Sequence, residues 1–216
     1  MPDGRCDIIL RYNTYGSGSP IPVITGPATQ PYTVGYDAGD SWLGMRLRPG
    51  KGVTLWQQRI TSAANTVLRG EDALELLPWL AELKGRYSTL NILAAALEAK
   101  TTGHFTDHRL SLALDILHTS GGRIRIEKLA TYVGCTSRHL NRIFRSNTGL
   151  SAKTYAQLLQ FHRTLKLIQH EHLSIADAAF EGGYADHAHL SRAFQCFGGF
   201  TPSSVPRDLS LPTLFS

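Results

Sequence analysis

The stretch IEKLATYVGCTSRHLNRIFRSNTGLS (residues 126–151) is repeated in outline by IADAAFEGGYADHAHLSRAFQCFGGFT (residues 175–201). The shared frame is Ile126, Ala130, Gly134, Leu140, Arg142, Phe144, Gly149 and Ser151 in the first repeat, and Ile175, Ala179, Gly183, Leu190, Arg192, Phe194, Gly199 and Thr201 in the second. The offset is 49 residues up to the first glycine and 50 residues beyond it, so one residue is inserted. Because a repeated frame indicates a repeated structural unit, we interpret each repeat as a helix, a short turn and a second helix.

Each position of the frame has a structural reason. The small alanine lets the first helix approach the second closely, and the glycine four residues later can adopt the positive φ of a tight turn. Leu140 and Phe144 lie four residues apart, so they share the buried face of the second helix, and Leu190 and Phe194 do the same in the second repeat. The remaining face of each second helix must therefore point outward.

The outward face of such a helix suits DNA. In helix-turn-helix proteins this helix enters the major groove, where Arg can bind guanine and Asn can bind adenine through paired hydrogen bonds. The outward-facing residues are Arg138, Asn141, Arg142 and Arg145 in the first repeat, and His187, Ala188 and Arg192 in the second. The candidates for the DNA backbone are Thr136, Ser137, Arg145 and His189, with the N-cap expected at Thr136 or Ser137 in the first repeat and at Asp186 in the second.

The segment between the repeats predicts a long helix over Ser151–His170. About 20 residues span about 30 Å, close to the roughly 34 Å of one DNA turn. Both second helices could therefore enter successive major grooves on one face of a duplex.

Positive charge is concentrated around the first repeat. The chain carries a net charge of +5, yet residues 123–166 alone contain nine Lys and Arg against one acidic residue, Glu127. The first repeat has a net charge of +3 and the second a net charge of −2. The second offers His187 and His189, and histidine gains charge only as the pH falls towards about 6.5. We expect the first repeat to anchor on DNA, and the second to contribute conditionally, after reorientation or with a partner such as RNA polymerase.

The remaining patterns predict an α+β fold. Short runs rich in β-formers and bounded by Gly and Pro predict strands over Asp7–Arg11, Pro22–Thr25, Tyr32–Tyr36 and Trp42–Arg48. Helical periodicity follows over Glu71–Lys84, with a kink at Pro78, over Thr89–Lys100, and then over Asp107–His118, Ile126–Val133, Ser137–Asn147, Ser174–Glu181 and Asp186–Phe197. We expect a small antiparallel β domain with helices over residues 1–102, an all-α, seven-helix double helix-turn-helix domain over residues 103–209, and an irregular tail over residues 210–216.

Several function classes are disfavoured. No apolar run approaches a membrane span and the N-terminus lacks a secretory pattern, so we expect a cytoplasmic protein with no membrane partner. Cys6, Cys135 and Cys196 form no CxxC pair, which argues against disulfides and zinc, and buried thiols are preferred to redox sensing. Residues 1–100 contain no histidine, and the chain has no GxSxG motif and no phosphate-binding glycine loop. We therefore expect no catalytic residues, no metal and no cofactor, and the chain is not expected to be an enzyme.

From about Asp107 to Arg207 the chain resembles the AraC/XylS family of bacterial-type transcriptional regulators. The resemblance rests on LATYVGCTSRHLNRIFRSNTGLSAKTY (129–155) and IADAAFEGGYADHAHLSRAFQCFGGFTPSSV (175–205). It implies sequence-specific DNA binding, with base contacts from Arg138, Asn141 and Arg142 in the first repeat and from His187, Ala188 and Arg192 in the second. Two positions depart from the family: Val205-Pro206-Arg207 stands where a Tyr-Arg pair is usual, and Ala188 offers only an apolar contact, such as one with a thymine methyl group.

The N-terminal part resembles the abbreviated cupin-type domain that precedes some such regulators, through PDGRCDIILRYN, Gly26-Pro27 and WLGMRLRPG. The first predicted strand begins close to Met1, so we expect a partial, truncated or short-start barrel. The expected partner is double-stranded DNA. The resemblance adds three further hypotheses: binding to RNA polymerase, binding of a small-molecule effector, and formation of a homodimer. Six aromatic residues either line an effector pocket or are ordinary core and surface aromatics: Tyr12, Tyr15, Tyr32, Tyr36, Trp42 and Trp56.

Two other functions stay open. The chain could be a helical protein-interaction module whose basic stripe is solvated surface, or a small-molecule-binding protein without specific DNA readout. Salt-dependent binding to duplex DNA separates these functions, because phosphate contacts release counterions.

Overall fold

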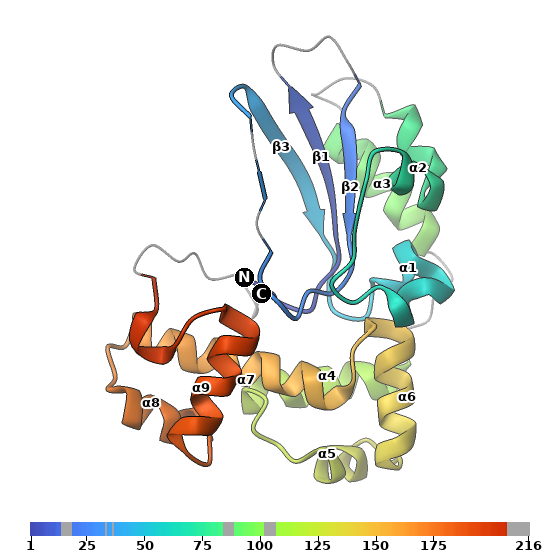
Figure 1. The fold of residues 1–216 in the computed structure, drawn as a ribbon. Helices are drawn as coiled ribbons and strands as arrows, with labels where there is room; N and C mark the ends of the chain where they lie inside the picture. Colours follow the sequence, from blue (N-terminus) through green and yellow to red (C-terminus); the bar gives the residue numbers. More distant parts are fainter. Residues whose placement is uncertain (14–18, 33, 36, 84–88, 102–106, 207–216) are drawn as a thin grey trace.

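The computed structural model describes residues 1–13, 19–32, 34–35, 37–83, 89–101 and 107–206 (Figure 1). A four-stranded antiparallel sheet with helices on one side forms the N-terminal half. The C-terminal half is built of helices and lies below the sheet in Figure 1. The expected α+β fold is confirmed.

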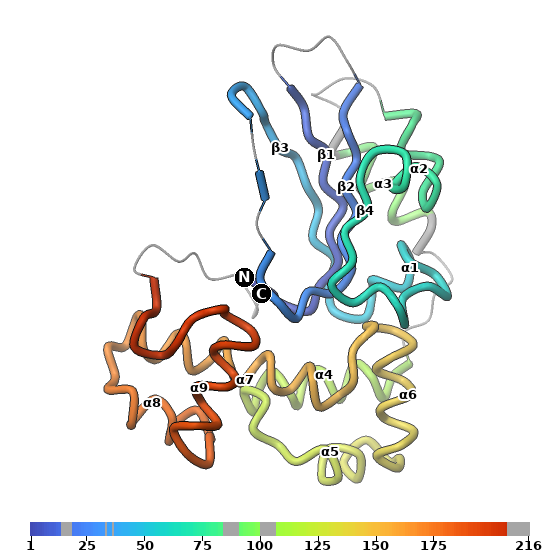
Figure 2. Tube along the Cα trace, in the orientation of Figure 1, coloured from blue at the N-terminus to red at the C-terminus, as the bar shows by residue number. Residues whose placement is uncertain are grey.

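The sheet consists of β1 (Asp7–Asn13), β2 (Ile21–Thr25), β3 (Asp40–Arg46) and β4 (Val67–Arg69), in the order β3-β1-β2-β4 (Figure 2). The strand expected over 32–36 is wrong for the residues described there: Tyr32, Val34 and Gly35 belong to no strand, while residues 33 and 36 lie outside the described residues. The fourth strand of the sheet is instead β4, whose three residues pair antiparallel with β2 and form one edge of the sheet. Such a short strand carries too little alternation to be visible in the sequence.

Five short helical elements accompany the sheet: α1 (Val53–Trp56), the 3-10 helix η1 (Gln57–Ser62), α2 (Glu71–Leu76), the 3-10 helix η2 (Pro78–Glu82) and α3 (Thr89–Thr101). Leu77, with φ −130° and ψ 78°, separates α2 from η2. The helix expected over Glu71–Lys84 is therefore two elements, because Pro78 disfavours helical geometry at the residue before it. Ile8, Leu10 and Ile24 of the sheet form one core with side chains from these helices, including Leu55 and Leu93.

The other face of the sheet is open. A hollow of about 350 Å³ lies on it, lined by Ile9, Val23, Tyr32, Trp42 and others. Of the six aromatic residues considered for an effector pocket, Tyr32 and Trp42 therefore line the same hollow. Trp56 is not among them, since it is buried in the core and donates from Nε1 to the Thr25 carbonyl oxygen at 3.1 Å. Tyr12 also packs against that core, and Tyr15 and Tyr36 lie outside the described residues.

The helical half contains α4 (His108–Ser120), α5 (Ile126–Tyr132), α6 (Ser137–Thr148), α7 (Ala152–Gln169), α8 (Ile175–Gly182), α9 (His187–Gly198) and the 3-10 helix η3 (Pro202–Ser204). Within the described residues, the seventh expected helix is thus a single 3-10 turn. Helices long and apolar enough to cross a bilayer do not occur in the described part of the chain.

Helix α7 joins the two repeats and is buried along most of its length. Tyr155 and Leu159 pack in one cluster with Leu140 and Phe144 of α6. Leu158, Phe161 and Leu165 pack in another cluster with Leu190 and Phe194 of α9. The cores of both repeats therefore share one helix.

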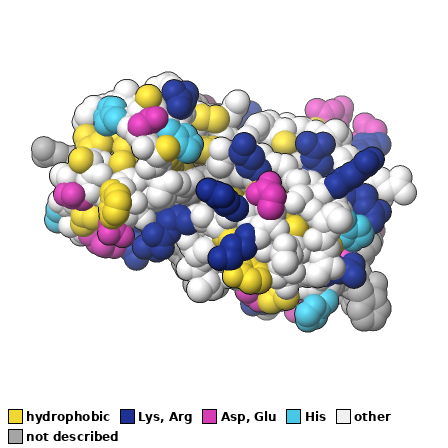
Figure 3. All heavy atoms as spheres, turned by 90° about the horizontal axis from the view of Figure 1, so that it is seen from below, with side chains coloured by type: hydrophobic (Ala, Val, Ile, Leu, Met, Phe, Trp, Pro, Cys, Tyr) yellow, Lys and Arg dark blue, Asp and Glu magenta, His cyan; other side chains and the backbone are white. Residues whose placement is uncertain are grey.

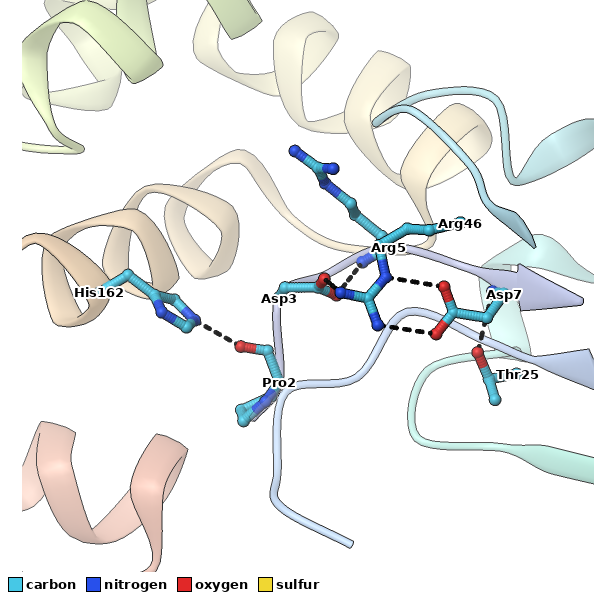
Figure 4. Close-up of polar contacts among 7 residues, drawn as sticks. All are labelled: Pro2, Asp3, Arg5, Asp7, Thr25, Arg46 and His162. Atoms are coloured by element: carbon cyan, nitrogen blue, oxygen red, sulfur yellow. Dashed lines mark hydrogen bonds and ion pairs between the residues drawn. The ribbon is translucent and has the colours of Figure 1, made fainter. Parts of the chain in front are cut away.

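The N-terminal segment, residues 1–5, lies between the sheet and α7 (Figure 4). His162 of α7 donates from Nε2 to the Pro2 carbonyl oxygen at 2.5 Å, and Met1 packs against the α7–α9 cluster. Asp3 is held by Arg46 at 2.9 Å, and Arg46 also pairs with Asp7 at the start of β1. The segment thus ties α7 to strands β1 and β3.

The N-terminal half also contacts the turn that follows the second helix of each repeat. Gly149 and Gly199 have φ of 74° and 76° and end α6 and α9 in the left-handed conformation. A Cβ atom on Gly149 would lie 2.6 Å from the Ile60 carbonyl oxygen, and one on Gly199 would lie 3.2 Å from Pro31. Glycine therefore suits both the backbone and the space at these two positions.

The first prediction concerns His162, which is 3% exposed. Burial lowers its pKa to about 4, so it is neutral in the folded protein near neutral pH. An unfolded histidine takes up a proton near pH 6.5, so stability falls as the pH drops from 6.5 to 4. Through this residue we expect a loss of about 2 kcal/mol of unfolding free energy between pH 7 and pH 5.

Urea unfolding at the two pH values measures this loss. The variant His162→Gln keeps a donor for the Pro2 carbonyl oxygen but cannot titrate, so its stability should depend less on pH. The exposed His108 serves as the control, and His108→Gln should keep the wild-type dependence. A His162→Gln variant that loses as much stability as wild type contradicts the assignment.

Candidate nucleic-acid interface

Each repeat has the expected tight turn between its two helices. Gly134 and Gly183 have φ of 68° and 75°, which confirms the prediction of a positive φ. The turns share one hydrogen-bond pattern: Cys135 N–H donates to the Ala130 carbonyl oxygen, and Tyr184 N–H to that of Ala179, both at 2.9 Å. Ala130 and Ala179 are buried, as close helix packing requires.

The second helices, α6 and α9, are positioned by equivalent contacts. Leu140, Phe144, Leu190 and Phe194 are all fully buried, as predicted. The Thr136 hydroxyl caps α6 by accepting from His139 N–H at 3.2 Å, which decides between Thr136 and Ser137. In the second repeat the Asp186 carboxylate accepts from His189 N–H at 2.6 Å.

The outward face of α6 is strongly basic. Arg138, Arg142 and Arg145 are exposed and line an open hollow of about 950 Å³ together with Lys153 of α7. Among the residues that the structure describes, none of these four cations has a carboxylate within ion-pair distance. This uncompensated charge is suited to an anionic partner.

His139 is a member of this face that the sequence reasoning did not single out. Its ring lies between two arginines: Nδ1 is 3.2 Å from Arg142 Nη2, and Nε2 is 3.5 Å from Arg109 Nη1. The Arg142 guanidinium therefore has a neighbour that can orient it. The signal in the sequence was the three-residue spacing from His139 to Arg142, which brings the side chains together on a helix.

Asn141 differs from its expected role as a base reader. It is half-buried, and its amide nitrogen donates to the Ser137 carbonyl oxygen at 3.0 Å. Its amide oxygen accepts from Ala152 N–H at 3.1 Å, at the first residue of α7. The side chain therefore joins α6 to α7 and is occupied by bonds within the protein.

The second repeat explains why Asn141 is needed. At an offset of 50 residues, Asn141 corresponds to Ser191 and Ala152 corresponds to Pro202. Proline has no N–H group, so the second repeat has no donor at this position to satisfy. An amide acceptor is required only in the first repeat.

The same offset shows how the two outward faces differ. Arg138, Arg142, Arg145 and Lys153 correspond to Ala188, Arg192, Gln195 and Ser203. Three of the four cations around α6 therefore have no counterpart around α9. Figure 3 views the molecule from below: Lys and Arg side chains spread over the centre and right, the side of the first repeat, while the left, the side of the second repeat, shows more acidic, histidine and hydrophobic side chains.

The remaining predicted residues of α9 lie partly against α7. His187, Ala188 and Arg192 are exposed, whereas His189 is half-buried with its ring edge-on to Tyr184 at 5.1 Å. His189 and Arg192 line a hollow of about 230 Å³. This hollow is also lined by Gln160, a buried residue that sequence reasoning missed and that donates to the Gly182 and Gly183 carbonyl oxygens.

Two residues of the basic run are engaged by contacts within the protein. Arg123 donates to the carbonyl oxygens of Ser120 and of Glu181 in α8, at 3.2 and 3.3 Å. Arg163 of α7 lies against Gly121, where a Cβ atom would be 2.6 Å from its Cδ. The expected polyanion footprint is therefore smaller than the nine basic residues of the sequence count.

Within the described residues, no group of three or more His, Cys, Asp or Glu side chains could hold a metal ion. The three cysteines are unpaired: Cys6 is buried, Cys135 is half-buried and Cys196 is exposed.

Comparison with known proteins finds matches for the helical half. A family model described as a helix-turn-helix domain matches residues 129–208. The Msm operon regulatory protein of Streptococcus mutans is 27% identical over 169 residues, covering 74% of this chain and 58% of that protein. The HTH-type transcriptional regulator GlxA of Rhizobium meliloti is 32% identical over 79 residues (37% of this chain, 24% of GlxA). The HTH-type transcriptional activator RhaR of Escherichia coli is 31% identical over 78 residues (36% of this chain, 28% of RhaR). Residues 129–208 match an AraC-type helix-turn-helix domain.

The resemblance noted in the sequence of the AraC-type domain is thereby confirmed. This chain spans 58% or less of the length of these curated relatives. A solved structure, the C-terminal domain of AraT, a response regulator from Geobacillus stearothermophilus, is similar with a TM-score of 0.44 and 18% identity, covering 51% of this chain and 93% of that chain.

The second prediction concerns the α6–α7 link in the AraC-type domain. Asn141→Ala removes two hydrogen bonds and leaves Ala152 N–H without its acceptor, so it should cost about 1–3 kcal/mol of unfolding free energy. Urea unfolding measures this cost. The matched control is Ser191→Ala at the equivalent position, which should cost less.

A double variant tests the stated cause. Ala152→Pro removes the N–H group, as in the second repeat, at a helix position that accepts proline. In that background Asn141→Ala should cost less than in wild type. Equal costs in both backgrounds would show that the bond to Ala152 is not what Asn141 contributes.

Proposed function

We propose that this chain is a sequence-specific DNA-binding transcriptional regulator that places α6 and α9 in successive major grooves. The observation that carries the proposal is the outward face of α6. Arg138, Arg142 and Arg145 project from an AraC-type helix-turn-helix unit with no carboxylate partner among the described residues. DNA phosphates and guanine edges supply the missing acceptors.

The linking helix supports two-groove binding. Helix α7 has 18 residues, which correspond to about 27 Å. This length is comparable with the roughly 34 Å between equivalent positions of adjacent major grooves. Because α7 packs against the cores of both repeats, the spacing between α6 and α9 is built into the domain.

The two repeats have unequal roles in this proposal. Arg138 and Arg142 read bases. Thr136 and Ser137 at the start of α6, Arg145 in its last turn and Lys153 of α7 bind phosphates. In the second repeat Arg192 is the main contact, with His187 and Ala188 at the start of α9. Asn141 contributes by holding α6 against α7, and His189 by packing on Tyr184.

The exposed surface of α8 suits a protein partner better than DNA. Phe180 is 81% exposed, and the exposed carboxylates of Asp177 and Glu181 lie on the same helix. We propose RNA polymerase as the protein that meets this surface. A small-molecule effector in the hollow beside Tyr32 and Trp42, a homodimer, and a division of the chain into residues 1–102 and 103–209 are further proposals.

Binding-site selection tests the main proposal. Wild-type chain should enrich a defined sequence from random duplex DNA, and binding should weaken steeply as salt rises. No enrichment and little salt dependence would favour a protein-interaction module with a solvated basic stripe. Salt-dependent binding without enrichment would leave DNA binding but remove specific readout.

The third prediction concerns base reading. Arg142→Ala should cost about 1–3 kcal/mol at the selected site and relax the preference at one base pair, because a paired hydrogen bond is lost. Footprinting and equilibrium binding to matched and substituted sites measure both effects. Arg192→Ala is the matched variant in the second repeat and should cost less. Equal losses from the two variants would contradict the unequal roles.

The fourth prediction concerns phosphate binding. Arg145→Ala should weaken binding to specific and non-specific duplexes alike and reduce the salt slope by about one unit, because one fewer counterion is released. Arg69→Ala, an exposed arginine of β4, is the control and should leave the slope unchanged. An unchanged slope for Arg145→Ala would remove Arg145 from the phosphate contacts.

A further inference from the structure

The 3-10 helix η1 of the N-terminal half lies directly beside the recognition helix α6. The Ile60 carbonyl oxygen approaches Gly149, just past the end of α6, and would be 2.6 Å from a Cβ atom there. The next residue, Thr61, is exposed and lines the same hollow as Arg138, Arg142 and Arg145. A segment about 80 residues away in sequence is therefore part of this surface.

A second hollow continues this surface along η1. It has a volume of about 670 Å³ and is lined by Gln57, Gln58 and Thr61 of η1 and by Ser146 of α6. Thr61 and Ser146 line both hollows, so the two adjoin. The polar face of η1 and the basic face of α6 thus form one continuous surface.

The charge of this segment matches that of α6. Residues 41–70 contain no Asp or Glu and five basic residues. Arg46 is neutralised by Asp3 and Asp7, and Arg69 lines the hollow on the sheet, which leaves Arg48, Lys51 and Arg59 as the cations of this segment. Gln57, Gln58 and Thr61 are exposed and carry amide and hydroxyl donors, which are common phosphate contacts in protein–DNA complexes. Such a surface suits a phosphate backbone and not an apolar partner.

The packing of η1 leaves the recognition face accessible. Arg138, Arg142 and Arg145 stay exposed although η1 is in place, and the hollow that they line is open. A duplex that fills this hollow to reach α6 therefore meets Thr61 as well.

We propose that η1 is an additional DNA-contacting element, in which Thr61 and Gln58 donate to backbone phosphates next to the segment bound by α6. The inference rests on the proposed function, because it assumes that α6 faces DNA. It adds a contact outside the AraC-type domain, made by the N-terminal half itself. The state of that half can then alter DNA affinity directly, without any movement of α6.

The fifth prediction uses opposite charges at one exposed position in the full chain. Thr61→Lys should bind a random-sequence duplex and the selected duplex several-fold more tightly, with a salt slope larger by about one unit. Thr61→Glu should bind both several-fold more weakly. Equilibrium titration at several salt concentrations measures affinity and slope together.

Ala38→Lys and Ala38→Glu are the matched controls for net charge. Ala38 is exposed in the turn before β3, where Asp40 pairs with Asn13 at the far end of β1. Asp7, at the other end of β1, is the end that lies beside the helical half. The turn with Ala38 is about 20 Å away from it along the strand. Both Ala38 variants should bind DNA almost as wild type does.

The outcomes separate this inference from the proposed function. Opposite shifts at Thr61 with flat Ala38 controls support the contact. Unchanged binding by both Thr61 variants, or equal weakening by both, overturns it, since neither result follows the sign of the charge. If Arg145→Ala still lowers the salt slope in either case, the proposed function survives without the η1 contact. If the wild-type chain enriches no sequence and its binding to duplex DNA does not depend on salt, the proposed function fails as well.

Discussion

The shared burial of α7 is the constraint on which the helical half depends. One side of this helix completes the core of the first repeat through Tyr155 and Leu159, and another completes the second through Phe161 and Leu165. The N-terminal segment closes against it through the Pro2–His162 hydrogen bond. A change in the position of α7 would therefore disturb three packed surfaces at once, which explains why buried residues occupy most of its length.

On this common support, the two repeats keep one geometry but carry different chemistry. The caps, the left-handed glycines and the buried Leu and Phe pairs coincide at matching positions, whereas three of the four cations around α6 have no counterpart around α9. Structural positions tolerate little change because they satisfy backbone geometry and packing. Exposed positions are free of both demands, so repeats that share a fold can diverge in what they bind.

Much of the helical half could be predicted from the sequence, because caps, turn glycines and buried periodicity act over a few residues. The role of Asn141 could not, since it depends on the N–H group of Ala152, eleven residues away and across a turn. Arg123 counted towards the predicted polyanion footprint, but it binds the Glu181 carbonyl oxygen of α8. His189 was a candidate for the DNA backbone, but its ring packs on Tyr184. In the N-terminal half, β4 and η1 are too short for a periodic signal, and their conformations are set by the strands and helices that they contact.

In the proposed DNA complex, the buried linking helix also determines what length of DNA the two repeats span together. Because α7 cannot lengthen or bend without exposing its packed faces, α6 and α9 keep a constant separation and rotation. Adding about five base pairs between two half-sites would turn one of them to the opposite side of the duplex. Binding by such a protein depends on the number of base pairs between two short sequences. The spacing of an operator therefore contributes to specificity even at base pairs that no side chain touches.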